Sequence, residues 1–167
     1  MKTLILVRHG KAGHSHLGGG DLERPLTHRG QTDSARMAEL FHEFDVRVHA
    51  VISSPALRAK TTAKCFADWV VLPVGLDERL YDAGVPELLD VVQGVEDFQE
   101  TIVLVGHNPG ISEFLRVLLN QGHADMPSAS IAVVNFDVPE WVDVVAGGGD
   151  LEWFMDPGTL AAESKAA

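Results

Sequence analysis

The stretch that decides the fold is the aliphatic run Leu4-Ile5-Leu6-Val7, which continues directly as Arg8-His9-Gly10. A run of consecutive aliphatic residues is typical of a strand that is buried on both faces of a parallel sheet. A second such run at 101–105 leads into Gly106-His107. Because the carboxyl ends of parallel strands meet at one edge of a sheet, we expect the residues after these two runs to lie close together.

Helical patterns separate the strand-like runs. Apolar residues recur at helical spacing in 27–44, and Ser54-Pro55 is a typical helix start after the strand-like run 49–53. Two further helical patterns begin at Pro86 and Gly110. This alternation of strands and helices predicts an α/β domain with a mostly parallel central sheet.

The pattern changes near the C-terminus, where strand-like runs follow one another without helices between them. These runs lie at 130–136, 141–145 and 151–155. Consecutive strands favour antiparallel pairing, so we expect an antiparallel C-terminal part of the sheet. We take residues 1–160 as a single domain and 161–167 as a frayed tail.

The composition is that of an ordinary globular domain, with 167 residues of which 46% are hydrophobic and 22% charged. Its 13 Lys and Arg against 24 Asp and Glu give a net charge of −11. This balance argues against a nucleic-acid or anionic-membrane binder, because both need a broad basic surface. Cys65 is the single cysteine, so no disulfide can form within the chain. Since no apolar stretch reaches the roughly 18 residues that a membrane span needs, we expect a cytoplasmic protein.

Arginine and histidine side chains follow three of the predicted strands. Arg8 and His9 follow the first, Arg58 lies in the first part of the helix after 49–53, and His107 follows the run 101–105. Guanidinium groups match phosphate oxygens bidentately, and helix N-termini add positive potential. We therefore expect these four side chains to form an anion pocket at one sheet edge, where a phosphate-bearing substrate binds.

The eight histidines also raise the question of a metal site. His9, His14 and His16 are close in sequence, but their spacing fits no helix face, and no cysteine or well-placed carboxylate completes a ligand set. We therefore expect no metal. His14 and His16 belong to a glycine-rich loop at 14–21, which either folds over a ligand or is a solvent loop.

Four motifs, in this order, resemble the histidine phosphatase superfamily: LVRHGKA at 6–12, RPLTHRG at 24–30, SSPALRAKTT at 53–62 and VGHNPG at 105–110. The Arg-Pro-Leu-Thr segment, the short chain and the tryptophan-bearing C-terminal strands look most like its SixA branch, the phosphohistidine phosphatases. The resemblance implies a three-layer α/β/α fold of the phosphoglycerate mutase type. It also implies a phosphohistidine intermediate and neither a metal nor a cofactor.

The same resemblance assigns roles by position. His9 is the expected nucleophile. The groups expected to bind the phosphoryl group and stabilise its transition state are Arg8, Arg58 and His107, and those expected to contact the substrate also include Gly10 and Asn108.

The chemistry is consistent with these residue types. An imidazole attacks phosphorus only when it is neutral, and two nearby arginines should lower the pKa of His9 toward that form. A backbone carbonyl on its other ring nitrogen would fix the tautomer. A protonated His107 would add positive charge where phosphoryl transfer spreads negative charge.

The general acid is open at this point. An ester leaving group needs a proton, usually from a carboxyl group, and residues 76–80 resemble the stretch that supplies it in mutase-like relatives. Glu78 is the candidate acid, although the same residues fit a solvated charge run. A phosphohistidine substrate needs this acid less, because its P–N bond is weak once the leaving imidazole is protonated.

The interval between Arg58 and His107 is almost filled by predicted elements, which leaves little chain for a lid. An open site would admit a phosphorylated side chain on another protein domain. The favoured function is therefore a metal-independent phosphatase that hydrolyses phosphohistidine on a protein. The alternatives are a small-molecule phosphate-ester phosphatase or mutase on the same fold, and a non-catalytic phospho-binding module.

Overall fold

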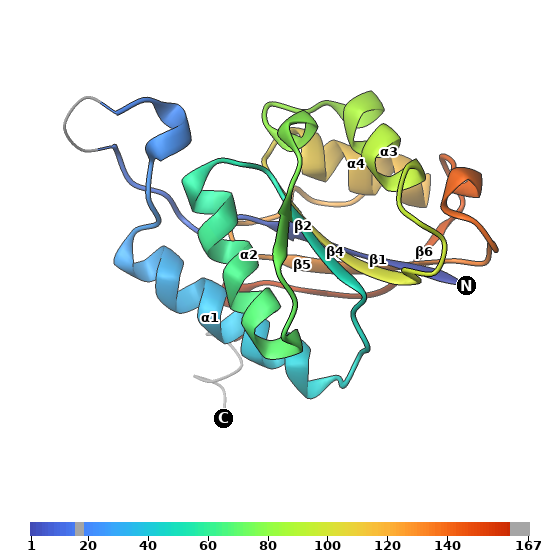
Figure 1. The fold of residues 1–167 in the computed structure, drawn as a ribbon, viewed down its shortest axis with the longest axis horizontal. Helices are drawn as coiled ribbons and strands as arrows, with labels where there is room; N and C mark the ends of the chain where they lie inside the picture. The colour runs from blue at the N-terminus through green and yellow to red at the C-terminus, as the bar shows by residue number, and fades with distance from the viewer. Residues whose placement is uncertain (16–18, 161–167) are drawn as a thin grey trace.

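The computed structural model describes residues 1–15 and 19–160, which form one mixed sheet covered by helices (Figure 1). The strand order is β3-β2-β4-β1-β5-β6. The strands are β1 (Lys2–Arg8), β2 (Ala50–Ser53), β3 (Val74–Leu76), β4 (Thr101–Gly106), β5 (Ile131–Phe136) and β6 (Gly149–Met155). The first four strands of the order are parallel, whereas β5 runs antiparallel to β1 and β6 antiparallel to β5. The predicted parallel sheet with an antiparallel C-terminal part is confirmed.

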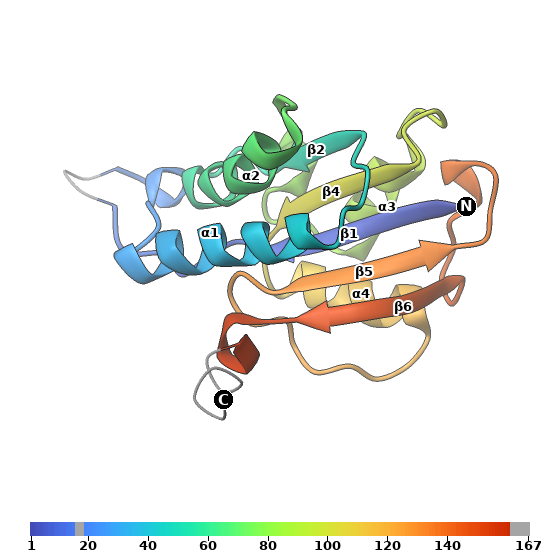
Figure 2. The ribbon, with the colours of Figure 1, turned by 90° about the horizontal axis from the view of Figure 1, so that it is seen from below.

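The helices cover both faces of this sheet (Figure 2). They are α1 (His28–Glu43), α2 (Leu57–Val70), α3 (Val85–Gln93) and α4 (Gly110–Leu119). The apolar residues of α1 and α2 pack on one face, and those of α3 and α4 pack on the other. The three-layer α/β/α architecture that the resemblance implied is therefore present.

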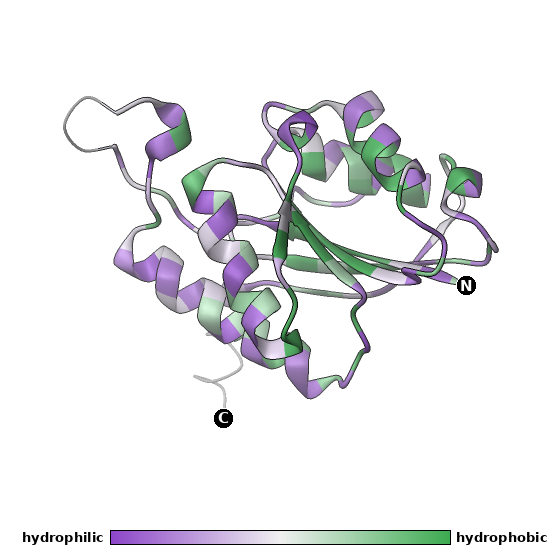
Figure 3. Cartoon of the chain, in the orientation of Figure 1, coloured by the Kyte–Doolittle hydropathy of each residue, from purple (hydrophilic) through white to green (hydrophobic). Residues whose placement is uncertain are grey.

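The aliphatic run in β1 explains this layering. Side chains alternate between the two faces of a strand, so Leu4 and Leu6 pack with α3 and α4 whereas Ile5 and Val7 pack with α1 and α2. All four side chains are fully buried. Figure 3 shows the central strands as almost continuously hydrophobic, as expected for a sheet covered on both faces.

Short 3₁₀ turns complete the chain. They are η1 (Asp21–Glu23), η2 (Glu78–Leu80) and η3 (Trp141–Asp143). The strand expected at 141–145 is wrong, because this segment begins with η3. This segment packs into the core through Trp141 instead. The Trp141 side chain is fully buried, and its indole N–H donates to the Gln99 carbonyl at 2.8 Å.

Two expectations concern the chain as a whole. No helix among residues 1–15 and 19–160 is long and apolar enough to cross a membrane. The frayed tail expected at 161–167 lies outside the described residues.

Candidate active site

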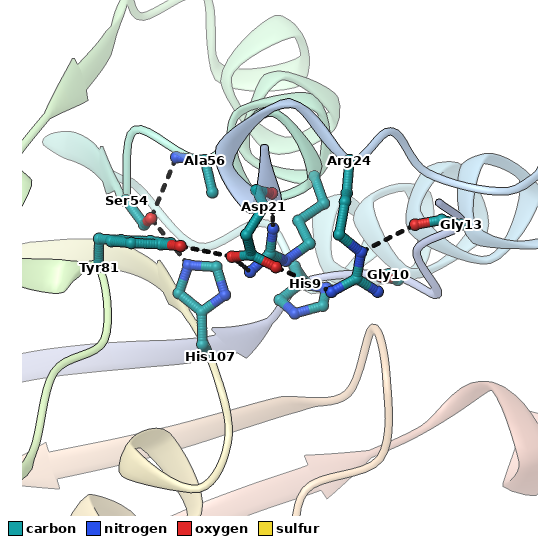
Figure 4. Close-up of polar contacts among 10 residues, drawn as sticks. His9, Gly10, Gly13, Asp21, Arg24, Ser54, Ala56, Tyr81 and His107 are labelled. Atoms are coloured by element: carbon teal, nitrogen blue, oxygen red, sulfur yellow. Dashed lines mark hydrogen bonds and ion pairs between the residues drawn. The ribbon is translucent and has the colours of Figure 1, made fainter. Parts of the chain in front are cut away.

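Three segments bring their polar side chains to the carboxyl edge of the sheet. His9 follows β1, His107 follows β4, and Arg58 extends from the first turn of α2, which follows β2. The rings of His9 and His107 lie 4.9 Å apart between centroids (Figure 4). Arg58 and His107 line the same cavity of about 270 Å³, so the structure brings together residues that are far apart in sequence.

One ring nitrogen of His9 is fixed by the backbone. Its Nδ1 lies 2.7 Å from the Gly10 carbonyl oxygen, and because a carbonyl only accepts, Nδ1 carries the proton and donates it. The tautomer leaves a lone pair on Nε2, which makes no hydrogen bond to any described residue. The sequence cannot show such a bond, and the structure supplies it.

The pKa of His9 is lowered to about 4, so the ring is neutral near pH 7. Burial of the ring is the largest cause, and the positive charges of Arg58, Arg8 and Arg24 lower the pKa further. The hydrogen bond to Gly10 acts in the opposite direction. The direction agrees with the sequence expectation, but desolvation contributes more than the two arginines on which that expectation rested.

His107 is also neutral in the free site, because burial, His9 and Arg58 lower its pKa to about 3. The sequence expectation of a protonated His107 concerns phosphoryl transfer, and it stays a prediction. Its Nε2 lies 2.8 Å from the Ser54 hydroxyl, whereas its buried Nδ1 has no hydrogen-bond partner among residues 1–15 and 19–160. A phosphoryl anion between these groups would raise the pKa of His107 and favour its charged form.

Ser54 explains why α2 begins later than predicted. The sequence placed the helix start at Ser54-Pro55, but α2 begins at Leu57. The Ser54 hydroxyl accepts the Ala56 N–H at 3.2 Å and contacts His107, so it supports the site rather than capping the helix in the usual way.

Arg8 is held by the segment that precedes β5. Its Nη1 donates to the Met126 carbonyl at 2.9 Å, and its buried Nε has no partner within the described part of the chain. Asn108 Nδ2 donates to the same carbonyl at 3.1 Å. The Ser112 hydroxyl donates to Asn108 Oδ1 at 2.6 Å and accepts the Met126 N–H at 2.8 Å. Asn108 therefore positions the loop that orients Arg8, and its expected contact with substrate stays a prediction.

Gly10 has a packing role in the structure. A Cβ atom there would lie 2.5 Å from the Ser34 hydroxyl and 2.7 Å from the Gly30 carbonyl oxygen, so β1 can approach α1 only with glycine at this position. The Gly10 N–H donates to the Thr62 hydroxyl at 3.0 Å. The expected substrate contact of Gly10 also stays a prediction.

Glu78 lies apart from these groups. It is the first residue of η2, its side chain is exposed, and it is not among the residues that line the cavity. The lining consists of Asp21, Arg58, Tyr81, Asp82, Ala83, His107, Asn108 and Pro109. The role of Glu78 as an acid stays a prediction.

Sequence reasoning missed the partner of Arg58. The buried guanidinium donates from Nη1 to the main-chain oxygen of Asp21 at 2.7 Å and from Nη2 to its carboxylate at 2.9 Å. Tyr81 and Arg24 contact the same carboxylate. Arg24 stands in a recognised motif but had no assigned role, and nothing in the sequence pattern connects Asp21 with a residue 37 positions later.

The structure bears on whether the chain holds a metal ion. Among residues 1–15 and 19–160, no group of three or more His, Cys, Asp or Glu side chains is arranged to hold a metal ion. His16, and with it part of the glycine-rich loop 14–21, lies outside the described residues.

A three-layer domain that gathers histidines and arginines at one sheet edge has a site suited to binding phosphoryl groups. The model of the histidine phosphatase superfamily (branch 1) matches residues 4–89, and the chain belongs to this superfamily. It is a phosphatase of the SixA-like branch, as its structural relatives indicate. The family resemblance drawn from the sequence motifs is confirmed.

The solved structures that it resembles include two SixA proteins. The putative phosphohistidine phosphatase SixA from Nakamurella multipartitia is 25% identical, with a TM-score of 0.81 over 93% of this chain and 96% of that chain. A protein histidine phosphatase SixA complexed with tungstate is 25% identical, with a TM-score of 0.80 over 95% of this chain and 99% of that one. An uncharacterized protein of Mycobacterium tuberculosis is 29% identical over 90% of this chain and 99% of its own.

Proposed function

We propose that this phosphatase hydrolyses phosphohistidine on a protein, with His9 as the nucleophile and Arg8, Arg58 and His107 as the groups that bind the phosphoryl group. The observation that carries the proposal is the state of the His9 ring. Its Nδ1 is bonded to the Gly10 carbonyl, its pKa is lowered to about 4, and Nε2 keeps a free lone pair.

The reaction has two transfers. In the first, His9 Nε2 attacks phosphorus, and the P–N bond to the substrate imidazole breaks with its electron pair returning to that nitrogen. The leaving imidazole carries a proton on its other nitrogen and departs as a neutral ring. In the second, a water oxygen attacks the phosphoryl group, the bond to His9 breaks, and inorganic phosphate is released.

The positive groups act on the charge of the phosphoryl oxygens. Phosphoryl transfer spreads charge over three oxygens, so fixed donors around them stabilise the transition state. Arg8 Nε is a buried donor without a partner in the described part of the chain, and an unsatisfied buried donor suits a bound anion. His107 Nδ1 is likewise buried without a partner there, and it becomes a donor when the ring is protonated. Arg8 is held in place by the Met126 carbonyl, so its orientation is set before substrate binds.

The surroundings of the cavity support a protein substrate. Between β3 and β4, the described chain forms only η2, α3 and short connections, and α3 packs against α4 (Figure 1). Of this segment, only residues 81–83 line the cavity. A phosphorylated side chain on another domain can therefore reach the site. Of the two similar SixA proteins, one is named a putative phosphohistidine phosphatase and the other a protein histidine phosphatase.

The experiment compares substrates under one condition. Purified protein in EDTA is given a protein domain phosphorylated on histidine, and separately p-nitrophenyl phosphate and 3-phosphoglycerate. We expect kcat/KM for the phosphohistidine domain to exceed that for either ester by about 100-fold, a ratio that differential transition-state binding can supply. Equal or faster turnover of an ester would refute the proposed substrate, and His9→Ala gives the background rate.

A further inference from the structure

The guanidinium of Arg58 is already occupied by an anion of the chain itself. Asp21 presents two oxygens to it: the main-chain oxygen to Nη1 at 2.7 Å and the carboxylate Oδ2 to Nη2 at 2.9 Å. The Tyr81 hydroxyl donates to the same Oδ2, and Arg24 Nη1 donates to Oδ1 at 3.1 Å. Figure 4 shows this carboxylate above the two histidine rings, between Tyr81 and Arg24.

The carboxylate is held in its charged form. Hydrogen bonds from Tyr81, Arg58 and Arg24 keep the pKa of Asp21 well below its usual range. Its negative charge also acts on His107, whose pKa it raises against the larger lowering effects. Asp21 and Asp82 both line the cavity, so the space next to the phosphoryl site is bordered by carboxylates.

We propose that Asp21 determines substrate specificity: its carboxylate favours a phosphoryl group carried on a protonated nitrogen base and disfavours one whose leaving group is an anion. This inference rests on the proposed function, because it explains how the same site selects phosphohistidine.

The charges around Arg58 account for this selectivity. A phosphoryl group that binds Arg58 must share the guanidinium with Asp21 or displace its carboxylate. This competition weakens the binding of every anionic ligand. A phosphohistidine ring with a proton on its second nitrogen offers a positive charge and an N–H donor to the carboxylate in return. A leaving group with a carboxylate or a second phosphate offers only like charge, and like charges placed side by side are strongly disfavoured.

An Asp21→Asn substitution removes the charge of Asp21 but keeps part of its contact with Arg58. The Asp21 side chain is 46% exposed, whereas that of Arg58 is 8% exposed. The main-chain oxygen at position 21 still accepts from Arg58 Nη1, and the amide oxygen of asparagine can still accept from Nη2. We therefore expect Asp21→Asn to fold, and thermal unfolding checks this. This makes the residue testable in the intact protein.

The decisive variant is Asp21→Asn. We expect its kcat/KM for the phosphohistidine domain to fall about tenfold, while kcat/KM for 3-phosphoglycerate stays constant or rises. Inorganic phosphate should inhibit the variant at about tenfold lower concentration than the wild type, because no carboxylate competes for Arg58. Asp21→Glu should restore the wild-type order of substrates.

Asp68→Asn is the matched control, because it removes one negative charge from the exposed surface of α2, where Asp68 pairs with Lys64. It should change neither the substrate ratio nor the inhibition by phosphate. Equal losses on both substrates in Asp21→Asn, or unchanged inhibition by phosphate, would overturn the inference. If the wild type fails to hydrolyse phosphohistidine, the proposed function fails, but the phosphate-inhibition comparison still tests the competition at Arg58.

Discussion

The parallel and antiparallel parts of the sheet contribute different groups to the same edge. The parallel strands bring side chains: Arg8 and His9 after β1, His107 after β4, and Arg58 after β2. The segment that leads into antiparallel β5 brings main-chain groups. The Met126 carbonyl holds the Arg8 guanidinium, the Ser130 carbonyl accepts the Arg8 N–H at 3.2 Å, and the Ala129 N–H donates to Arg8 and His9 carbonyls.

This difference separates reacting groups from the groups that fix them. In the proposed mechanism, the side chains of the parallel part provide the nucleophile and the positive charge. The main chain of the antiparallel part satisfies buried donors and acceptors around them, and so restricts their movement. Substitutions in the two parts should therefore differ in how strongly they lower activity and stability.

The largest effect should come from a charge of the parallel part. Arg58→Ala removes a buried guanidinium that lines the cavity with His107, and we expect kcat/KM to fall about 10³-fold. Thermal unfolding confirms that the variant is folded. Arg79→Ala, which removes an exposed arginine paired with Asp77, should change kcat/KM less than about twofold. A loss below about tenfold for Arg58→Ala would show that the reacting groups are not those of the parallel part.

The lowered pKa of the half-buried His9 should also make stability depend on pH. The pKa of His9 is about 4 in the folded chain, against 6.5 for an exposed ring. Between these values the unfolded chain binds a proton that the folded chain does not, so stability falls as the pH falls from 6.5 to 4. His9→Asn removes this linkage.

Urea unfolding at pH 7 and pH 4 measures the effect. Between pH 7 and pH 4, the wild type should lose up to about 3 kcal/mol more free energy of unfolding than His9→Asn. Solvent around the partly exposed ring makes this difference smaller. Identical losses in the two proteins would contradict a half-buried, neutral His9.

A smaller effect should come from the supports of the antiparallel part. Ser112→Ala leaves the buried Met126 N–H without its partner and frees Asn108, which should cost about 1–3 kcal/mol of unfolding free energy. Because Met126 also holds Arg8, kcat/KM should fall about tenfold. Thr61→Ala removes an exposed hydroxyl that bonds only its own helix, and it should shift stability by less than about 0.5 kcal/mol. A loss of stability without any loss of activity would show that the Met126 loop does not control the orientation of Arg8.

The smallest effect should come from Glu78. It lies outside the cavity with an exposed side chain, so Glu78→Gln should change phosphohistidine hydrolysis by less than about twofold. Parallel assays on phosphohistidine and p-nitrophenyl phosphate measure this. A selective loss on the ester would establish Glu78 as the general acid and move the substrate class toward phosphate esters.

The same contrast explains how much could be predicted from the sequence. The aliphatic runs predicted β1 and β4, and the side chains that follow them could be placed at one edge because parallel strands end together. The Met126 carbonyl could not be found in this way, since every residue carries a carbonyl and only tertiary packing decides which one faces Arg8.

The errors and omissions have physical reasons as well. The run at 141–145 has strand-like residues, but it begins with a 3₁₀ turn. In this turn Trp141 is buried and its indole N–H donates to the Gln99 carbonyl. The neutral state of His107 follows from burial, which a sequence does not reveal. The contact of Asp21 with Arg58 depends on how η1 folds back over α2, and no local spacing encodes it.

Trapping the phosphorylated protein tests the central claim most directly. The wild type and His9→Ala are mixed with the phosphohistidine domain, quenched within milliseconds in alkali, where phosphohistidine survives, and digested for mass spectrometry. The account predicts a single new phosphoryl group on His9 in the wild type and none in His9→Ala. A phosphoryl group on another residue, or equal labelling of His9→Ala, would contradict it.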